Sequence, residues 1–146
     1  MMNEELLIET LKHKEILDLD KCAPLYRLCN DRLFDYLSCS DFICFFNLKY
    51  YGEPVKIKHR KKQHVLYLIA IIEEFIKSNQ LSYADVWVDC FLDQLQLKKE
   101  DYKKYRYNID HCLGSASNKA FVDAINGIFG LSEFEAKRRQ DKGNDI

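Results

Sequence analysis

The chain has 146 residues, of which 47% are hydrophobic and 31% are charged, and its formal net charge is -1. This balance is typical of one globular domain, and five glycines and two prolines exclude a collagen-like or disordered chain. The longest apolar run, residues 65–72, is far shorter than the ~18 residues that a membrane-spanning helix needs. The acidic start does not resemble a signal peptide. We therefore expect a soluble cytoplasmic protein with a single domain over 1–146 and no membrane partner.

The six cysteines form no Cys-x-x-Cys pair, so zinc-ribbon and redox chemistry have no local support. Cys22 and Cys29 are seven residues apart and would share one helix face, separated by ~10.5 Å along the axis, which is too far for a disulfide. The sequence also lacks the common zinc-protease, nucleophile-elbow and Walker motifs. We expect reduced structural thiols, no metal, no cofactor and no catalytic residue.

In the first half of the chain, apolar periodicity predicts helices over residues 4–17 and about 23–37, the second with Pro24 in its first turn. A short aromatic helix is predicted over 42–48. A loop with Gly and Pro follows, and residues 55–58 alternate apolar and basic side chains, which indicates an extended arm or one edge strand.

In the second half, two long helices are predicted over about 60–77 and 82–97, separated at Ser78-Asn79. A short helix is expected near 100–107, and another over 118–129 that ends at Gly130. The chain thus predicts an all-α fold, a compact bundle of about six to seven helices with at most one short β-arm or hairpin near 50–58. Residues 1–49 would form a helical scaffold and residues 55–140 a helical module.

The most distinctive segment is the basic run Lys56-Ile57-Lys58-His59-Arg60-Lys61-Lys62, in which five of seven residues are Lys or Arg. It precedes a predicted helix, and helix N-termini favour acids, so helix stability does not explain it. A phosphate partner would explain it, because cations and free backbone N–H groups bind anions together. The alternative is a solvated helix entry whose charges pair with Glu53 and other acids.

A second basic segment covers residues 98–107, where lysines and tyrosines interleave. Its tyrosines could stack on bases while its cations hold phosphates, but the spacing of Tyr102 and Tyr105 favours packing into the core. Together the two segments give the candidate nucleic-acid-binding residues Lys56, Lys58, Arg60, Lys61, Lys62, Lys103, Lys104 and Arg106.

Three acids, Asp85, Asp89 and Asp93, fall on one face of a predicted helix. Carboxylates can hold Mg²⁺, but no further acidic pair or His is placed to complete a catalytic metal site. A solvated face, or a set of partners that neutralises one of the basic segments, is the favoured interpretation.

From Val55 to Phe129 the order of features resembles the C-terminal part of RteC-type regulators, which are associated with excision of conjugative transposons. The similar elements are the basic lead-in, the aliphatic helix Leu66-Tyr67-Leu68-Ile69-Ala70-Ile71, and the later segments that contain Asp101-Tyr102 and Ala120-Phe121-Val122. The resemblance implies DNA binding in a regulatory role and a winged-helix-like arrangement. It implies no catalytic residues.

The sequence therefore predicts a small non-enzymatic accessory protein that binds nucleic acid, with DNA as the expected partner, through residues 56–62. The alternative is a protein–protein interaction module or a homodimer. Its surface would be the aromatic set Phe42, Phe45, Phe46, Tyr50 and Tyr51.

Overall fold

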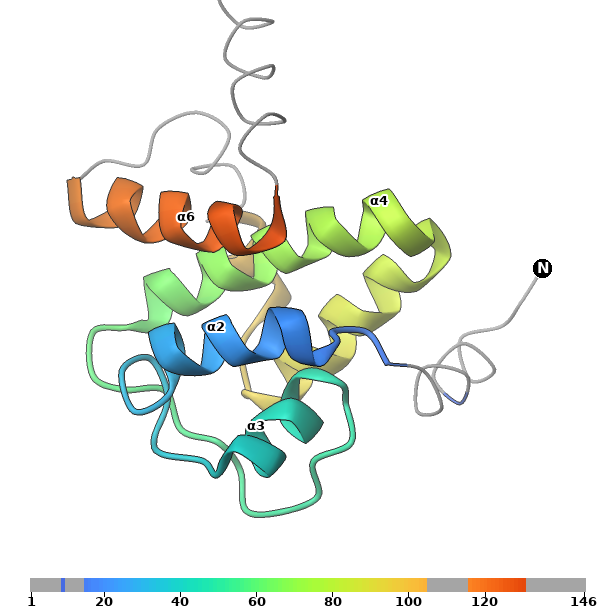
Figure 1. The fold of residues 1–146 in the computed structure, drawn as a ribbon, viewed down its shortest axis with the longest axis horizontal. Helices are drawn as coiled ribbons and strands as arrows, with labels where there is room; N and C mark the ends of the chain where they lie inside the picture. Colours follow the sequence, from blue (N-terminus) through green and yellow to red (C-terminus); the bar gives the residue numbers. More distant parts are fainter. Residues whose placement is uncertain (1–8, 10–14, 105–115, 131–146) are drawn as a thin grey trace, which may run out of the picture.

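The computed structural model describes residues 9, 15–104 and 116–130, except for the side chains of residues 79–82. Figure 1 shows the arrangement of its helices. The named helices are α2 (Leu19–Cys29), α3 (Cys39–Phe46), α4 (Lys62–Gln94) and α6 (Ala116–Phe129), and residues 99–104 are also helical. The prediction of an all-α fold is confirmed. The helix predicted over 4–17 and the tail after Gly130 lie almost wholly outside the described residues.

Helix α2 begins earlier than predicted because Asp18 caps it: the Asp18 carboxylate accepts a hydrogen bond from the backbone N–H of Lys21 at 3.1 Å. Pro24 consequently lies inside the helix and not in its first turn. The helix ends at Cys29, well before the predicted residue 37, because the backbone of Asn30 is extended with φ -65° and ψ 132°, and Asp31 then adopts a left-handed backbone with φ 57°.

Helix α3 is capped by Ser38, whose hydroxyl accepts a hydrogen bond from the backbone N–H of Asp41 at 3.1 Å. Its apolar face buries Phe42, Phe45 and Phe46 completely. The helix therefore starts three residues before the predicted boundary, and its aromatic side chains belong to the core.

The two long helices predicted over 60–77 and 82–97 form one continuous helix, α4. Figure 1 shows that α4 bends sharply near its middle, so that its second limb turns back beneath the first. No proline or glycine occurs there to end the helix. The Ser78 hydroxyl donates to the backbone carbonyl of Phe75 at 2.8 Å, and this local competition with the backbone ladder is a known cause of helix bending.

The predicted extended arm is present as a short pairing between the segment before α4 and the turn after α2. Phe34 and Ile57 form an isolated antiparallel bridge. The backbone N–H of Asp35 donates to the carbonyl of Lys56 at 3.0 Å, and that of Lys58 donates to the carbonyl of Leu33 at 2.8 Å. These hydrogen bonds hold the first residues of the basic run against the turn that follows α2.

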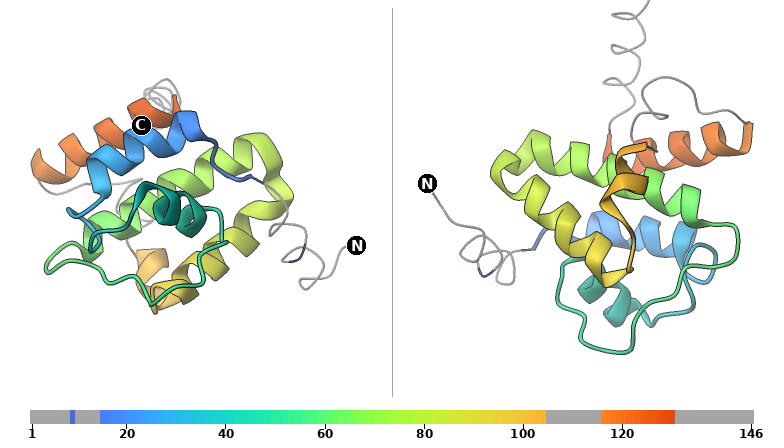
Figure 2. Two further views of the ribbon diagram at one scale, coloured as in Figure 1. Left: turned by 60° about the horizontal axis from the view of Figure 1, so that its bottom comes forward. Right: turned by 180° about the vertical axis from the view of Figure 1, so that it is seen from behind.

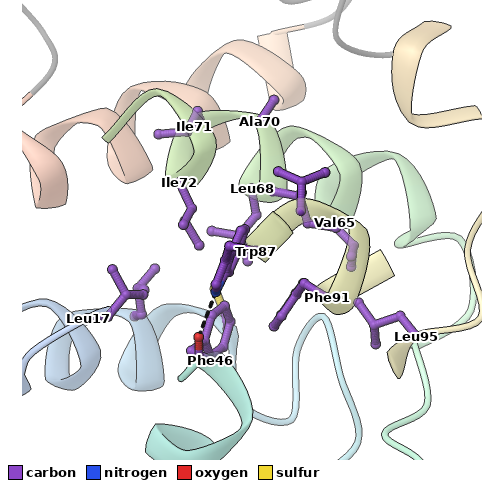
Figure 3. Packing of buried hydrophobic residues seen from close by; sticks show 14 of the residues in the cluster. Leu17, Phe46, Val65, Leu68, Ala70, Ile71, Ile72, Trp87, Phe91 and Leu95 are labelled. Carbon is purple, nitrogen blue, oxygen red and sulfur yellow. Dashed lines mark hydrogen bonds between the residues drawn. The ribbon is translucent and has the colours of Figure 1, made fainter. Parts of the chain in front are cut away.

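One hydrophobic cluster runs through the described residues from Leu17 to Phe129. At its centre Trp87 is fully buried, stacks on Phe91 with ring centroids 4.7 Å apart, and donates its indole N–H to the carbonyl of Phe46 at 3.0 Å (Figure 3). Phe45 of α3 also packs on Phe91 of α4, at 4.7 Å. The N-terminal scaffold and the second-half module therefore share one core.

Helix α6 covers the first limb of α4 and also contacts α2 (Figure 2). The Lys21 ammonium holds the end of α6 by donating to the carbonyl of Ile128 at 3.3 Å. The rings of Phe75 and Phe129 also pack there, with centroids 4.9 Å apart. Gly130 takes φ 68° directly after the helix, as predicted for its C-terminal stop. None of the helices in the described part of the chain combines the length and apolar character that crossing a bilayer requires.

Candidate nucleic-acid interface

The basic run forms a turn and then the first residue of α4. The backbone N–H of Lys61 donates to the carbonyl of Lys58 at 3.1 Å, which closes the turn, and α4 begins at Lys62. Within this turn Arg60 has φ 61°, a left-handed conformation that glycine adopts without cost and that a long side chain does not favour. The geometry exposes the Arg60 side chain to solvent.

The start of α4 differs from the starts of α2 and α3. No described side chain caps it, and its first turn contains no acid. The partial positive charge of the helix N-terminus thus adds to the charges of Arg60, Lys61 and Lys62 and is not offset by a cap. This placement opposes helix stability, as expected from the sequence.

The second basic segment lies against the start of α4. Lys62 Nζ is 2.8 Å from Asp101 Oδ2, although the two residues are 39 positions apart in the chain. Figure 2 (right) shows the helical residues 99–104 crossing the first limb of α4. The fold therefore brings together the two segments that the sequence indicated separately.

A buried hydrogen bond holds this segment in place. The Tyr102 hydroxyl donates to Glu73 Oε2 of α4 at 2.7 Å, and the two residues are only 5% and 7% exposed. Burial, followed by the charge of Glu73, raises the pKa of Tyr102 far above its usual range, so Tyr102 remains a donor. Tyr102 packs inward, as the sequence favoured, and does not form a base-stacking surface. Tyr105 and Arg106 lie outside the described residues.

The acids that neutralise the basic run are not those suggested by the sequence. Lys58 pairs with Asp31 at 2.9 Å and approaches Asp35 at 3.9 Å, and Lys62 pairs with Asp101. Among the three aspartates of α4, the ion pair that the structure gives is that of Asp89, with Lys99 at 3.2 Å. Asp31 and Asp35 were missed because they reach Lys58 only through the bridge between Phe34 and Ile57.

Most of the cations in the two segments make no ion pair with another described residue. Six of them make no ion pair within the part of the chain that the structure describes: Lys56, Arg60, Lys61, Lys98, Lys103 and Lys104. All are exposed except Lys61, which is half-buried. The pKa of Asp101 is lowered by its hydrogen bond from Lys62, by the charge of Lys62, and further by Lys98 and Lys104. Asp101 is thus one acid within a group of lysines.

The aromatic set proposed as an interaction surface is largely internal. Phe42, Phe45 and Phe46 are 0% exposed, so they are part of the core and are not available to a partner. Tyr50 is half-buried on Phe45, with ring centroids 6.3 Å apart. Only Tyr51, which is 80% exposed, has the exposure that the prediction required. The prediction was wrong because the sequence does not show that all three phenylalanines of this short helix face the core.

His64 belongs to the contact between α4 and α6 and not to the exposed basic surface. Its ring stacks on Phe121 with centroids 4.5 Å apart, and its Nε2 lies 2.9 Å from Asn118 Oδ1. Burial lowers the pKa of His64, the hydrogen bond with Asn118 opposes this, and the charge of Lys61 lowers the pKa further. His64 is therefore a packing residue beside the cations.

The cysteines show no arrangement for chemistry in the described residues. Cys22 and Cys29 are buried on one face of α2, and burial raises the pKa of each thiol to about 12. The described residues contain no group of three or more His, Cys, Asp or Glu side chains that could hold a metal ion.

Comparisons with protein families, with characterised proteins and with solved structures found no match to this chain.

Proposed function

We propose that this protein binds nucleic acid through a basic surface made of residues 56–62 and 98–104. The observation that carries the proposal is the ion pair between Lys62 and Asp101, which joins the two segments while six other cations remain without an ion pair in the described chain. A protein of net charge -1 that has nine of its 22 Lys and Arg residues in two adjoining segments is suited to a local polyanion contact.

The contacts would be made chiefly to phosphates. Lys61, Lys98 and Lys104 lie around the start of α4, where a partial positive charge and uncapped backbone N–H groups favour anions. Arg60 supports the proposal because its side chain is kept at a backbone position that costs about 1–2 kcal/mol for a non-glycine residue. Backbone strain of this kind is common at residues whose side chains have a functional role.

The proposal assigns the protein an accessory, non-enzymatic role, since binding accounts for the residues concerned without any reaction. Phosphate contacts alone carry no sequence information, so the proposal concerns affinity and not a recognition sequence. The resemblance to RteC-type regulators stays a prediction that agrees with DNA as the partner.

Titration of a fluorescently labelled DNA duplex and of one of its strands, followed by anisotropy at low salt, tests the proposal. We expect saturable binding that weakens in Lys61→Ala and in Lys104→Ala. Lys99→Ala is the matched control, because the Lys99 ammonium already pairs with Asp89 at 3.2 Å, and it should weaken binding less. Absence of binding to either DNA, or equal losses in all three variants, would count against this surface.

A further inference from the structure

Two tyrosines, Tyr36 and Tyr51, are exposed close to the start of the basic run. Their side chains are 67% and 80% exposed, and the third exposed large hydrophobic side chain of the described residues is Leu19. Single exposed apolar residues are ordinary on protein surfaces. These two differ in their position, because one follows a residue that is hydrogen-bonded to Lys56 and the other precedes Lys56 by five residues.

Tyr36 is placed by the short backbone pairing at the start of the basic run. The preceding residue, Asp35, donates its backbone N–H to the carbonyl of Lys56 at 3.0 Å, so the two segments lie side by side. Tyr36 also shares a side-chain hydrogen bond with Tyr26 of α2, and the Tyr26 hydroxyl donates to the carbonyl of Leu37 at 3.1 Å. The Tyr36 ring is therefore held in position although it is exposed.

Tyr51 lies in the loop between α3 and the basic run, and both of its neighbours in the chain are fixed. Tyr50 packs on Phe45 with ring centroids 6.3 Å apart. Gly52 lies so close to Tyr50 that a Cβ on the glycine would come within 2.6 Å of a carbon of the Tyr50 ring. The backbone on each side of Tyr51 is thus anchored, while its own side chain is left in solvent.

The loop that carries Tyr51 lies between the two basic segments. This loop lines a small cleft together with Gln96, which is two residues before Lys98 of the second segment. Lys56 of the first segment follows the loop directly. Both lysines are exposed, and neither makes an ion pair in the described chain. A molecule bound against Tyr51 would therefore have a cation of each segment close by.

Acids are present in this region but do not outnumber the cations. Asp31 and Asp35 pair with Lys58, at 2.9 Å and 3.9 Å, and Glu53 and Asp93 are exposed. Residues 31–36, 53–61 and 93–98 together contain six Lys and Arg residues and four Asp and Glu residues. The charge beside the two tyrosines thus favours an anionic ligand.

From these placements we infer that Tyr36 and Tyr51 are stacking platforms for the bases of a single-stranded nucleic acid whose phosphates lie on the basic surface. Aromatic rings beside cations suit single strands, because every base offers a flat π-face and every nucleotide a phosphate. A duplex keeps its bases stacked on one another, so it cannot use the two rings. The inference rests on the proposed function and narrows its partner to single strands.

The test compares labelled oligo(dT) of about 12 nucleotides with a strand of the same length made of abasic sites. The two strands carry equal phosphate charge, so any difference in affinity reports on the bases. We expect oligo(dT) to bind about a hundredfold more tightly, from two stacked bases that contribute about tenfold each. Tyr36→Ala and Tyr51→Ala should each weaken oligo(dT) binding about tenfold. Unchanged affinity for the abasic strand in both variants would show that they fold normally.

Two control variants assign the effect to the rings. Tyr51→Phe keeps an aromatic ring and should bind oligo(dT) as tightly as the unchanged protein. Leu19→Ala removes an exposed apolar side chain at the start of α2 and should leave the affinities for both strands unchanged.

Two results would overturn the inference while leaving the proposed function intact: equal affinities for oligo(dT) and the abasic strand, or full oligo(dT) affinity in either alanine variant. Absence of binding to both strands and to a duplex of the same length would instead overturn the proposed function.

Discussion

Lys62 Nζ lies 2.8 Å from Asp101 Oδ2, and this contact connects the start of α4 with the helical residues 99–104. Both side chains are partly exposed, so the ion pair itself adds little to stability. Its importance is positional, because it marks where two lysine-rich segments meet. The anchoring energy comes from the neighbouring buried hydrogen bond between Tyr102 and Glu73.

Removing that hydrogen bond should loosen the second basic segment. In Tyr102→Phe we expect the free energy of unfolding to fall by about 1.5–3 kcal/mol, as for a hydrogen bond to a charged group. Urea unfolding can be followed by the fluorescence of Trp87, the single tryptophan, which is fully buried. Nucleic-acid affinity should fall as well.

Glu73→Gln is the control for this prediction. Its side-chain oxygen can still accept from Tyr102, although the contact of Glu73 with Lys77 at 3.4 Å is lost. It should therefore be less destabilising than Tyr102→Phe. If Tyr102→Phe retained full stability and full affinity, the proposed role of this hydrogen bond would be wrong.

Substitutions of Arg60 should change the stability of the protein and its affinity for DNA in different ways. Arg60→Gly should leave the protein equally stable or more stable by about 0.5 kcal/mol, since relief of the left-handed strain is partly offset by the entropy of glycine in the unfolded chain. Its affinity for DNA should fall. Arg60→Ala, which removes the same charge but keeps the strain, should bind as weakly and be less stable than Arg60→Gly. Undiminished affinity in both variants would exclude Arg60 from the surface.

Asp101→Asn should strengthen DNA binding, whereas the Arg60 substitutions should weaken it. The change removes one negative charge among Lys62, Lys98 and Lys104 and frees the Lys62 ammonium. We expect affinity for DNA at low salt to rise by about threefold to tenfold, comparable to the gain of one phosphate contact. The measurement is the same anisotropy titration, with Asp41→Asn, an exposed aspartate on α3, as the charge-matched control. Weaker binding in Asp101→Asn would contradict the proposed location of the phosphates.

His64 should make stability depend on pH. Its pKa in the folded protein lies below the ordinary 6.5, so the folded state resists protonation while the unfolded chain accepts it. The contribution of neutral His64 to the free energy of unfolding is thus fully present above about pH 6.5. This contribution is lost as the pH falls below that value toward the pKa of His64 in the folded state.

The groups that face the His64 ring are Asn118 and Phe121 from α6, with Lys61 beside it on α4. Urea unfolding at about pH 7.5 and about pH 5 should show a smaller loss of stability in His64→Gln than in the unchanged protein. His59→Gln, at an exposed position in the turn, serves as the control. An identical pH dependence in all three proteins would exclude His64 as the cause.

The fold class could be predicted from the sequence because the apolar residues of α2 and α6 recur at helical spacing and form the buried faces of these helices. Boundaries were less accurate where a single side chain decides them. Asp18 and Ser38 extend α2 and α3 toward their N-termini through capping hydrogen bonds, and α4 continues through Ser78, where the pattern indicated a break.

The site could be predicted only in part. The local charge density of residues 56–62 is visible in the sequence, but the pairing of Lys58 with Asp31 and of Lys62 with Asp101 depends on tertiary contacts. The aromatic residues of α3 were assigned to a surface because composition alone does not show which face of a short helix is buried.

The most direct test of the central claim is the salt dependence of DNA binding in the unchanged protein, in Lys61→Ala, in Lys104→Ala and in the double variant. If residues 56–62 and 98–104 form one phosphate-binding surface, the logarithm of the binding constant should fall with a slope of several units against the logarithm of salt concentration. Each single change should reduce that slope by about 0.7–0.9, and the double change by about twice as much. A slope near zero, or a slope that Lys104→Ala leaves unchanged while Lys61→Ala lowers it, would contradict the account.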